Sequence, residues 1–337
     1  MSAASARSAL RPDDRRSAGT AKRRASAGVE GRNRESAHEY EETALSIHES
    51  AVIDARAELD DDVDVGPYVI IDGPVRVHGG TRIGAHAVLM GWTEIGPKCA
   101  IHSFACVGDV PQDRAYAGAR SFCRIGGGTV IREGATVHRG TTPESTTRVG
   151  ERCMLMANAH VGHNCQIADD VVLVNGALLA GHVSVGPRAF ISGLTGIHQF
   201  VRIGELAMIG GLVKIGMDVP PFFTVDGNPE ACTGVNVVGL RRAGLAPPER
   251  EELRAAYRLL YRSARPFRAA VDELAGVVRT DPGRRLVEFL RADSKRGILA
   301  GNARVSSGRR AGSAEDRPAA PAEACPRLPL DDCEPLI

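Results

Sequence analysis

A large aliphatic residue recurs at every sixth position over half of the 337-residue chain. The register fails only at Asp113, Ala119 and Pro143, and after each interruption it resumes at a multiple of six. A repeat this strict dictates the course of the backbone. We call the repeating residues the anchors: Ile47, Ile53, Leu59, Val65, Ile71, Val77, Ile83, Leu89, Ile95, Ile101, Val107, Ile125, Ile131, Val137, Val149, Leu155, Val161, Ile167, Leu173, Leu179, Val185, Ile191, Ile197, Ile203, Ile209 and Ile215.

A period of six does not fit an α-helix, whose 3.6-residue turn would scatter the anchors around its circumference. It fits coils of three short strands of about six residues each, in which every anchor points to the axis. An ordinary β-sandwich would instead show alternation with turns every 8 to 12 residues. The ladder therefore predicts a stacked parallel β-helix. Glycines after anchors, such as Gly84 and Gly96, are expected at corners that need unusual dihedrals.

Composition narrows the class of protein further. The chain carries 42 Lys and Arg against 41 Asp and Glu, which argues against general nucleic-acid binding. No apolar stretch approaches the roughly 20 residues of a transmembrane span. The eight cysteines form no C-x-x-C pair, so we expect reduced thiols in a cytoplasmic protein.

The two ends of the chain differ from its middle. Residues 1–45 are rich in Ala, Ser and Arg and nearly lack large apolar side chains, so they predict a disordered tail. Residues 301–337 have the same polar character and predict a second one. The remaining expected boundaries are a β-helix domain at 46–236, loops within it at 109–123 and 141–148, and a small helical domain at 237–300.

The expected helical domain follows the ladder. Pro247 and Pro248, with Glu249 after them, are typical of a helix start, and an apolar stripe at helical spacing begins at Leu253. Residues 241–296 carry 14 Lys and Arg against 8 Asp and Glu. This local excess indicates either a solvated helix face or a surface that attracts an acidic partner.

Four histidines cluster in three consecutive turns of the predicted β-helix. They are His160, His163, His182 and His198. Histidine is the side chain best suited to moving protons near neutral pH. Because His160, His182 and His198 follow one another at 22 and 16 residues, close to the length of one coil, we expect them near the same edge. The cluster predicts a catalytic site.

Several motifs resemble the acyl-carrier-protein:UDP-N-acetylglucosamine O-acyltransferase family of hexapeptide-repeat transferases, over about Ile47 to Ala300. The matching segments are Pro111-Gln112-Asp113 with Tyr116-Ala117-Gly118, Ile131-Arg132-Glu133, Val137-His138-Arg139-Gly140, the four-histidine segment, Asp218-Val219-Pro220-Pro221-Phe222, Gly227-Asn228, Gly234-Val235-Asn236 with Gly239-Leu240, and Ala256-Tyr257-Arg258 with Tyr261-Arg262-Ser263. The resemblance implies a left-handed β-helix that forms a homotrimer with active sites between subunits. It also implies transfer of an (R)-3-hydroxyacyl group from acyl carrier protein to the 3-hydroxyl of UDP-N-acetylglucosamine, the first step of lipid A synthesis, without a metal or other cofactor.

The resemblance also implies roles for individual residues. His163 corresponds to the general base and the Gly181 backbone N–H to the donor that binds the oxyanion. Gln112 and Asp113 would reach in from the neighbouring subunit to orient the sugar or acyl chain. The other positions implied in substrate binding are His160, His182, His198 and Gln199, then Gly211 at the bottom of the acyl groove, and Asn236 and Arg242 at the nucleotide.

The chain departs from the family pattern at four positions. Asn164 stands where an Asp often follows the catalytic His, and Ala115 where the first loop often has Lys. Val238 replaces an acidic residue near the nucleotide, and Ala243 replaces one of two neighbouring basic residues. An amide at 164 orients an imidazole without offsetting its positive charge, which predicts a slower enzyme.

Three alternatives remain open at this point. The first is a related N-acyltransferase, or an acceptor with a 3-amino group, although the N-acyltransferases normally carry an extra folded N-terminal domain. The second is a zinc carbonic anhydrase of the same fold, using His160, His163 and His182 as ligands. The third is a non-catalytic β-helix scaffold, if Asn164 and Ala115 mark a decayed site.

Overall fold

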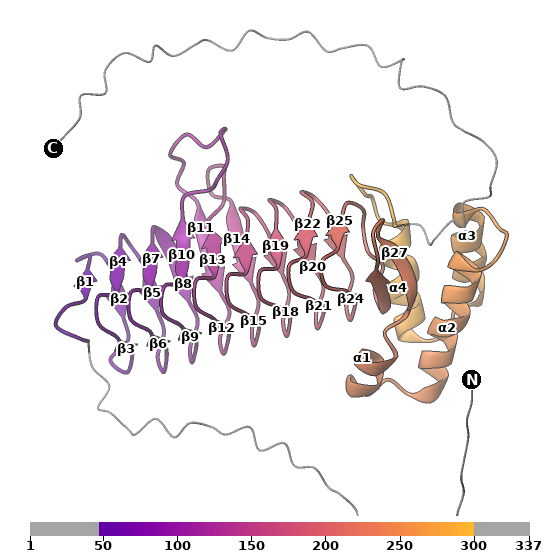
Figure 1. The fold of residues 1–337 in the computed structure, drawn as a ribbon, viewed down its shortest axis with the longest axis horizontal. Coiled ribbons are helices and arrows are strands. Elements are labelled where there is room, and N and C mark those ends of the chain that lie inside the picture. Colours follow the sequence, from indigo (N-terminus) through magenta and orange to yellow (C-terminus); the bar gives the residue numbers. More distant parts are fainter. Residues whose placement is uncertain (1–46, 300–337) are drawn as a thin grey trace, which may run out of the picture. The chain divides into compact units, whose positions relative to one another are not determined.

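Three sheets, parallel except for one antiparallel pair at the end of the third, make up the larger part of the computed structural model, which describes residues 47–299 (Figure 1). The predicted tails at 1–45 and 301–337 lie outside the described residues. Sheet 1 contains β1 (Val52–Ile53), β4 (Ile70–Asp72), β7 (Val88–Met90), β10 (Cys106–Asp109), β13 (Thr136–His138), β16 (His160–Val161), β19 (Leu178–Leu179), β22 (Gly196–Ile197) and β25 (Lys214–Ile215). Sheet 2 contains β2 (Glu58–Leu59), β5 (Arg76–Val77), β8 (Trp92–Ile95), β11 (Phe122–Ile125), β14 (Thr146–Val149), β17 (Gln166–Ile167), β20 (Ser184–Val185) and β23 (Arg202–Ile203). Sheet 3 contains β3 (Asp64–Val65), β6 (Arg82–Ile83), β9 (Ala100–Ile101), β12 (Val130–Ile131), β15 (Met154–Leu155), β18 (Val172–Leu173), β21 (Phe190–Ile191), β24 (Met208–Ile209), β26 (Phe223–Asp226) and β27 (Ala231–Val235).

The anchors stack on one another along the axis of the coils. Ile53 pairs with Ile71 on the next coil, and Leu173 pairs with Ile191. From Val65 to Ile215 every anchor is buried, which removes the apolar side chains from water. The first anchors are partly exposed because no described coil precedes them. The predicted fold class is confirmed: a mainly β chain built as a parallel β-helix and followed by helices.

Glycines follow many anchors for a reason other than the expected one. Their φ angles are mostly ordinary, and the left-handed positions lie two residues later, at residues such as His86 (φ 60°) and Lys98 (φ 57°). A Cβ on Gly84 would lie 2.8 Å from the Ser103 nitrogen on the next coil, closer than van der Waals contact allows. Glycine is therefore needed for close stacking of coils. The corners do contain unusual dihedrals, but the prediction that these glycines adopt them was wrong.

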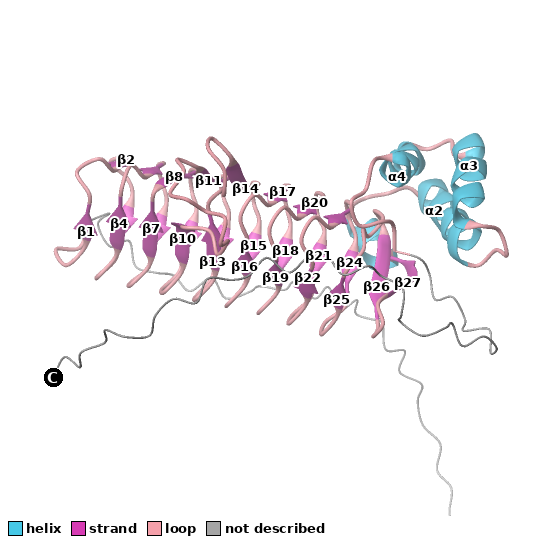
Figure 2. Cartoon of the chain, turned by 90° about the horizontal axis from the view of Figure 1, so that it is seen from above, coloured by secondary structure: helices cyan, strands magenta, loops and turns pink. Residues whose placement is uncertain are grey.

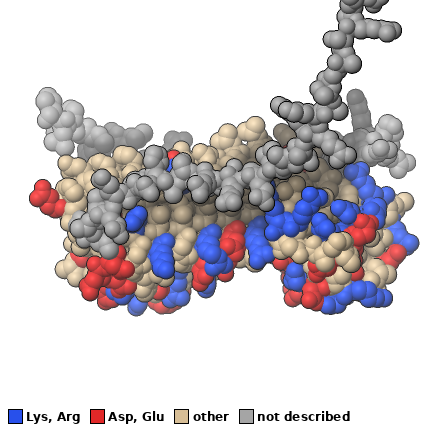
Figure 3. All heavy atoms as spheres, turned by 90° about the horizontal axis from the view of Figure 1, so that it is seen from below, with Lys and Arg blue, Asp and Glu red and all other residues tan. Residues whose placement is uncertain are grey.

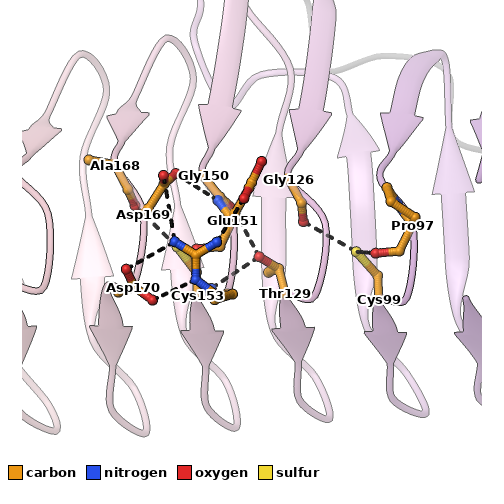
Figure 4. A network of polar contacts seen from close by, with 11 residues as sticks. Pro97, Cys99, Gly126, Thr129, Gly150, Glu151, Cys153, Ala168, Asp169 and Asp170 are labelled. Atoms are coloured by element: carbon orange, nitrogen blue, oxygen red, sulfur yellow. Dashed lines mark hydrogen bonds and ion pairs between the residues drawn. The ribbon is translucent and has the colours of Figure 1, made fainter.

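Buried hydroxyl and thiol groups join successive coils at the corner between sheets 2 and 3 (Figure 4). The Thr129 hydroxyl donates to the Gly150 carbonyl oxygen (2.8 Å) and accepts from the Cys153 N–H (3.1 Å). The Cys153 thiol in turn donates to the Ala168 carbonyl oxygen (3.2 Å), and burial raises its pKa to about 11. These bonds satisfy backbone groups that the tight corners leave without a sheet partner.

Two longer connections leave the coils, and both contain the ladder interruptions. Residues 110–121 join β10 to β11, and residues 139–145 join β13 to β14. Both are slightly shorter than the loops expected at 109–123 and 141–148, because β11 and β14 begin earlier. The first connection projects from the stacked coils in Figure 1.

The C-terminal helices pack on the last coil and share with it a buried apolar cluster that is separate from the cluster inside the coils. They are α1 (Val237–Arg242), α2 (Pro247–Tyr261), α3 (Phe267–Val277) and α4 (Asp281–Arg291), coloured cyan in Figure 2. Leu253, Leu274 and Leu286 from these helices share one buried apolar cluster with Phe222 and Phe223 of the β-helix. None of the described helices is long and apolar enough to cross a membrane.

Candidate active site

A cavity of about 690 Å³ lies over sheet 1, beside its corner with sheet 2. It collects predicted site residues that are far apart in the sequence. The predicted residues that line it are Gln112, Asp113, His160, His163, Gly181, His198 and Gln199. His163, Gly181 and Gln199 each lie two residues after an anchor of sheet 1, so they occupy the same corner on three successive coils.

His163 is 8% exposed, and its two ring nitrogens have different surroundings. The side-chain oxygen of Asn164 lies 2.9 Å from Nδ1 and also accepts the Thr141 N–H (3.1 Å). Because this oxygen is an acceptor, Nδ1 carries the hydrogen and Nε2 presents a lone pair. Nε2 makes no hydrogen bond to any described residue. His163 is therefore oriented as a proton acceptor at the cavity.

Gly181 lies directly beneath the His163 ring. A Cβ at Gly181 would be 2.4 Å from both Cε1 and Nε2, so any side chain there would displace the ring. Among the hydrogen bonds of the described residues none is donated by the Gly181 N–H. The free ring nitrogen of His163 and an unused backbone donor thus stand next to each other, an arrangement that suits acyl transfer.

The first loop, residues 110–121, brings Asp113 to the corner of the β-helix that carries His163. Asp113 Oδ2 lies 3.7 Å from His163 Nε2, within the same chain. This places Asp113 beside the His163 of its own chain, and the expected contribution of the first loop to a neighbouring subunit stays a prediction. Arg139 holds the loop by donating to the Gly108 carbonyl oxygen (3.0 Å) and the Tyr116 hydroxyl (3.0 Å). Sequence analysis missed this role because Arg139 gave no signal beyond its place in a family motif.

Three other imidazoles surround His163, and burial lowers the pKa of each. Burial, then His138 and His163, lower the pKa of His160 from its usual 6.5 to about 4. Burial also lowers the pKa of His138 and of His182. His160 Nδ1 bonds to the Thr136 hydroxyl (2.7 Å), and the His182 ring stands edge-on to His163 with centroids 5.2 Å apart. Imidazoles with lowered pKa values add no positive charge beside His163 near neutral pH.

Acidification is expected to destabilise the fold through His160. In the unfolded chain its pKa is near 6.5, whereas in the fold it is about 4, so between these values only the unfolded chain binds the proton. Stability is therefore complete above pH 6.5 and falls as the pH drops toward 4. Thermal unfolding at pH 7 and pH 5 measures this loss, which we expect to be smaller in His160→Gln. An equal loss in both proteins would contradict the assignment.

The predicted nucleotide residues line a second cavity, of about 870 Å³, over sheet 3 and α1. Asn236 and Arg242 both contribute to it. The Asn236 side chain is partly engaged in structure: its oxygen accepts the Gly239 N–H (2.9 Å) as the N-cap of α1, and its nitrogen donates to the Leu206 carbonyl oxygen (2.8 Å). One amide hydrogen and one lone pair are left for a ligand.

Two predicted residues line neither cavity. Gly211 follows β24 at the corner between sheets 3 and 1, where a Cβ would lie 3.3 Å from the Gly193 carbonyl oxygen. His182 stands behind His163 and stacks on Phe200 at 4.7 Å.

Sequence analysis also missed Lys214 and His138, which line the first cavity from sheet 1. Lys214 belongs to no motif, and its place depends on the stacking of coils.

Within residues 47–299 no three His, Cys, Asp or Glu side chains converge as metal ligands. His163 Nδ1 is already bonded to Asn164, and His182 meets His163 edge-on rather than with a shared nitrogen focus. The three-histidine zinc alternative therefore finds no ligand set in this geometry.

Family models match two parts of the chain. The model described as "Udp N-acetylglucosamine O-acyltransferase; Domain 2" matches residues 218–299, and "Bacterial transferase hexapeptide (six repeats)" matches residues 146–181.

Curated relatives and solved structures match far more of it. The acyl-[acyl-carrier-protein]–UDP-N-acetylglucosamine O-acyltransferase of Alkalilimnicola ehrlichii is 44% identical over 255 residues, 75% of this chain and 98% of the relative. That of Synechocystis is 46% identical over 187 residues, 56% of this chain and 68% of the relative. The structure of UDP-N-acetylglucosamine acyltransferase from Francisella novicida is 34% identical with a TM-score of 0.74, covering 77% of this chain and 95% of the other.

Proposed function

Because this chain belongs to the acyl-[acyl-carrier-protein]–UDP-N-acetylglucosamine O-acyltransferase family, we propose that it transfers an (R)-3-hydroxyacyl group from acyl carrier protein to the 3-hydroxyl of UDP-N-acetylglucosamine. It is an O-acyltransferase of the hexapeptide-repeat class. The product of this reaction begins lipid A synthesis. The observation that carries the proposal is the free Nε2 of His163 beside the unused Gly181 N–H at one cavity.

In the proposed mechanism His163 Nε2 accepts the proton of the sugar 3-hydroxyl while that oxygen attacks the thioester carbonyl. The carbonyl oxygen becomes an oxyanion that the Gly181 N–H stabilises, since this donor is fixed and needs no reorganisation. Collapse of the intermediate breaks the C–S bond, and the thiolate of the carrier takes the proton back from the imidazolium. The products are the ester and the free carrier thiol, with no net proton change.

The remaining predicted residues take supporting roles in this proposal. Asp113, 3.7 Å from Nε2, is suited to accept a hydrogen bond from another donor group of the sugar and so to turn the 3-hydroxyl toward the base. Gln112, His160, His198 and Gln199 line the same cavity and supply polar contacts to the sugar and acyl chain. His182 supports the His163 ring. Gly211 keeps the position that the family resemblance implies, at the bottom of the acyl groove.

We also propose a homotrimer whose active sites lie between subunits. The cavity with His163 lies over sheet 1, whereas the cavity with Asn236 and Arg242 lies over sheet 3, and no residue lines both. A single chain thus presents the base and the nucleotide contacts on different faces. Packing of sheet 1 of one subunit near sheet 3 of the next would bring them to one substrate.

Asn164→Asp is expected to raise the turnover number about fivefold, because a charge-assisted hydrogen bond contributes about 1 kcal/mol more than a neutral one. The carboxylate would stabilise the imidazolium that forms during transfer, which the Asn164 amide does not. Steady-state assays of the two proteins measure this. Asn158→Asp is the matched control, since Asn158 has the same left-handed φ (57°, against 61°) at another corner. An unchanged rate in Asn164→Asp would mean that another group stabilises the imidazolium.

The proposal is tested with purified protein, a panel of 3-hydroxyacyl carrier proteins and two acceptors, UDP-N-acetylglucosamine and its 3-amino analogue. We expect an ester product with the hydroxyl acceptor, identified by its mass and its lability to alkali. A product formed only with the 3-amino acceptor would replace the proposal with N-acyl transfer. No product with any pair would favour the non-catalytic scaffold.

A further inference from the structure

The second cavity has an unbalanced charge. Its charged side chains are Arg188 and Arg242, and no Asp or Glu lines it. Arg188 also borders the neighbouring cavity over sheet 2, where Asp169, Asp170 and Glu205 accompany the arginines. On the side of the molecule drawn in Figure 3, Lys and Arg side chains are interspersed with Asp and Glu, so the lack of carboxylates belongs to the cavity and not to the whole surface. A cavity with two guanidinium groups and no carboxylate is suited to a dianion.

The two arginines come from different parts of the fold. Arg188 lies three residues after the anchor Val185, at the corner between sheets 2 and 3, with φ 57°. Arg242 is the last residue of α1. A β-helix corner and a helix that follows the β-helix thus contribute one guanidinium each to the same cavity.

Neither arginine is neutralised by a described carboxylate. Arg188 and Arg242 form no ion pair with any residue in 47–299, whereas nearby Arg152 lies 2.9 Å from Asp170 and 2.7 Å from Glu151. The low pKa of Asp170 has its largest cause in the hydrogen bond from Arg152, and Arg188 is the least of the causes. Asp170, whose pKa Arg188 also lowers, is therefore already paired with Arg152, and both cavity arginines are available to an anion.

Two of the departures from the family pattern, Val238 and Ala243, lie in the same cavity. Ala243 lines it in place of the second residue of a basic pair, and Val238 lines it in place of an acid. Phe190, Leu206 and Met208 form an apolar wall, which suits the flat face of a base or ribose. A diphosphate bound here would meet Arg242 and, in place of a side chain from position 243, Arg188.

We propose that Arg188 is the second guanidinium that binds the diphosphate of the nucleotide sugar, replacing the basic residue absent at Ala243. The inference rests on the proposed function, since it assigns the nucleotide to this cavity. Arg188 reaches the diphosphate from the β-helix corner and Arg242 reaches it from α1. Their planar guanidinium groups donate charge-assisted hydrogen bonds to both phosphates.

The test measures binding of UDP, and of uridine, to the wild-type protein and to variants by calorimetry. Arg188→Ala is expected to weaken UDP binding about tenfold, the loss of one charge-assisted contact, and to leave uridine binding unchanged. Arg148→Ala is the control, because Arg148 lines only the neighbouring cavity. Ala243→Arg added to Arg188→Ala is expected to restore most of the affinity for UDP.

Three outcomes would overturn the inference. Unchanged UDP affinity in Arg188→Ala would remove Arg188 from the site while leaving the proposed function intact. An equal loss for UDP and uridine would make Arg188 part of the cavity wall rather than a phosphate contact. A wild-type protein that bound neither UDP nor UDP-N-acetylglucosamine would overturn both this inference and the proposed function.

Discussion

Replacing His163 with alanine is expected to lower the turnover number about 10³-fold, the middle of the range for loss of a general base. The Asn164 side-chain oxygen bonds His163 Nδ1. The other ring nitrogen, Nε2, is therefore left as an acceptor beside Gly181. Without the imidazole the sugar hydroxyl would have to attack without losing its proton to a base. Single-turnover rates with acyl carrier protein and UDP-N-acetylglucosamine measure the loss.

The His163→Ala variant must also keep its fold for this result to have meaning. Its thermal midpoint and its affinity for UDP are expected to match the wild type, because the nucleotide cavity shares no residue with the His163 cavity. His78→Ala is the control: this histidine contacts Asp60 and Glu94 on sheet 2 and should leave the rate unchanged. Normal turnover in His163→Ala would assign the base to another residue.

Asp218→Asn is expected to destabilise the protein by about 3 kcal/mol, the lower end of the cost of breaking a buried ion pair. Asp218 is fully buried, and its carboxylate accepts from Arg202 Nε (2.7 Å) and from the Arg202 backbone N–H (2.8 Å). Its backbone also pairs with Gly297 and Leu299, so the residue joins the last coil to the end of the described chain. Neutralising it leaves the Arg202 charge without a partner.

Urea unfolding followed by circular dichroism compares this variant with an exposed pair of the same chemistry. Asp272 lies 3.2 Å from Arg291, and both side chains are more than half exposed. Asp272→Asn is therefore expected to change stability by less than about 1 kcal/mol. Equal effects of the two substitutions would show that burial of the Asp218 carboxylate is unimportant.

The scaffold was predictable because its cause is local and repeated. A six-residue period with anchors such as Ile131 and Leu155 has one physical solution, and the structure buries those anchors as expected. The helix beginning at Pro247 was equally clear, since proline, acidic residues and an apolar stripe agree. What failed was the explanation for glycines such as Gly84, because the contact that excludes a Cβ comes from the next coil and not from the local backbone.

The site was predictable as a set of residues but not as an arrangement. The histidine cluster and the family motifs named His163 and Asp113, yet the sequence did not reveal that one chain brings them within 3.7 Å. Arg139 fixes the start of the loop by donating to the Gly108 carbonyl oxygen. The two residues are 31 positions apart, so the sequence did not reveal this contact. Arg188 was missed for the same reason: only the stacking of coils brings it to the cavity of Arg242.

The central claim is that His163 of one subunit acts on a nucleotide sugar held by the cavity of the next subunit. Trimers of His163→Ala and of Arg242→Glu are each expected to be almost inactive. Dissociating the two variants, mixing them equally and reassembling them should restore about a quarter of the wild-type activity, because random assembly pairs the two intact halves at one interface in four. Mixed trimers no more active than their parents would contradict an active site shared between subunits.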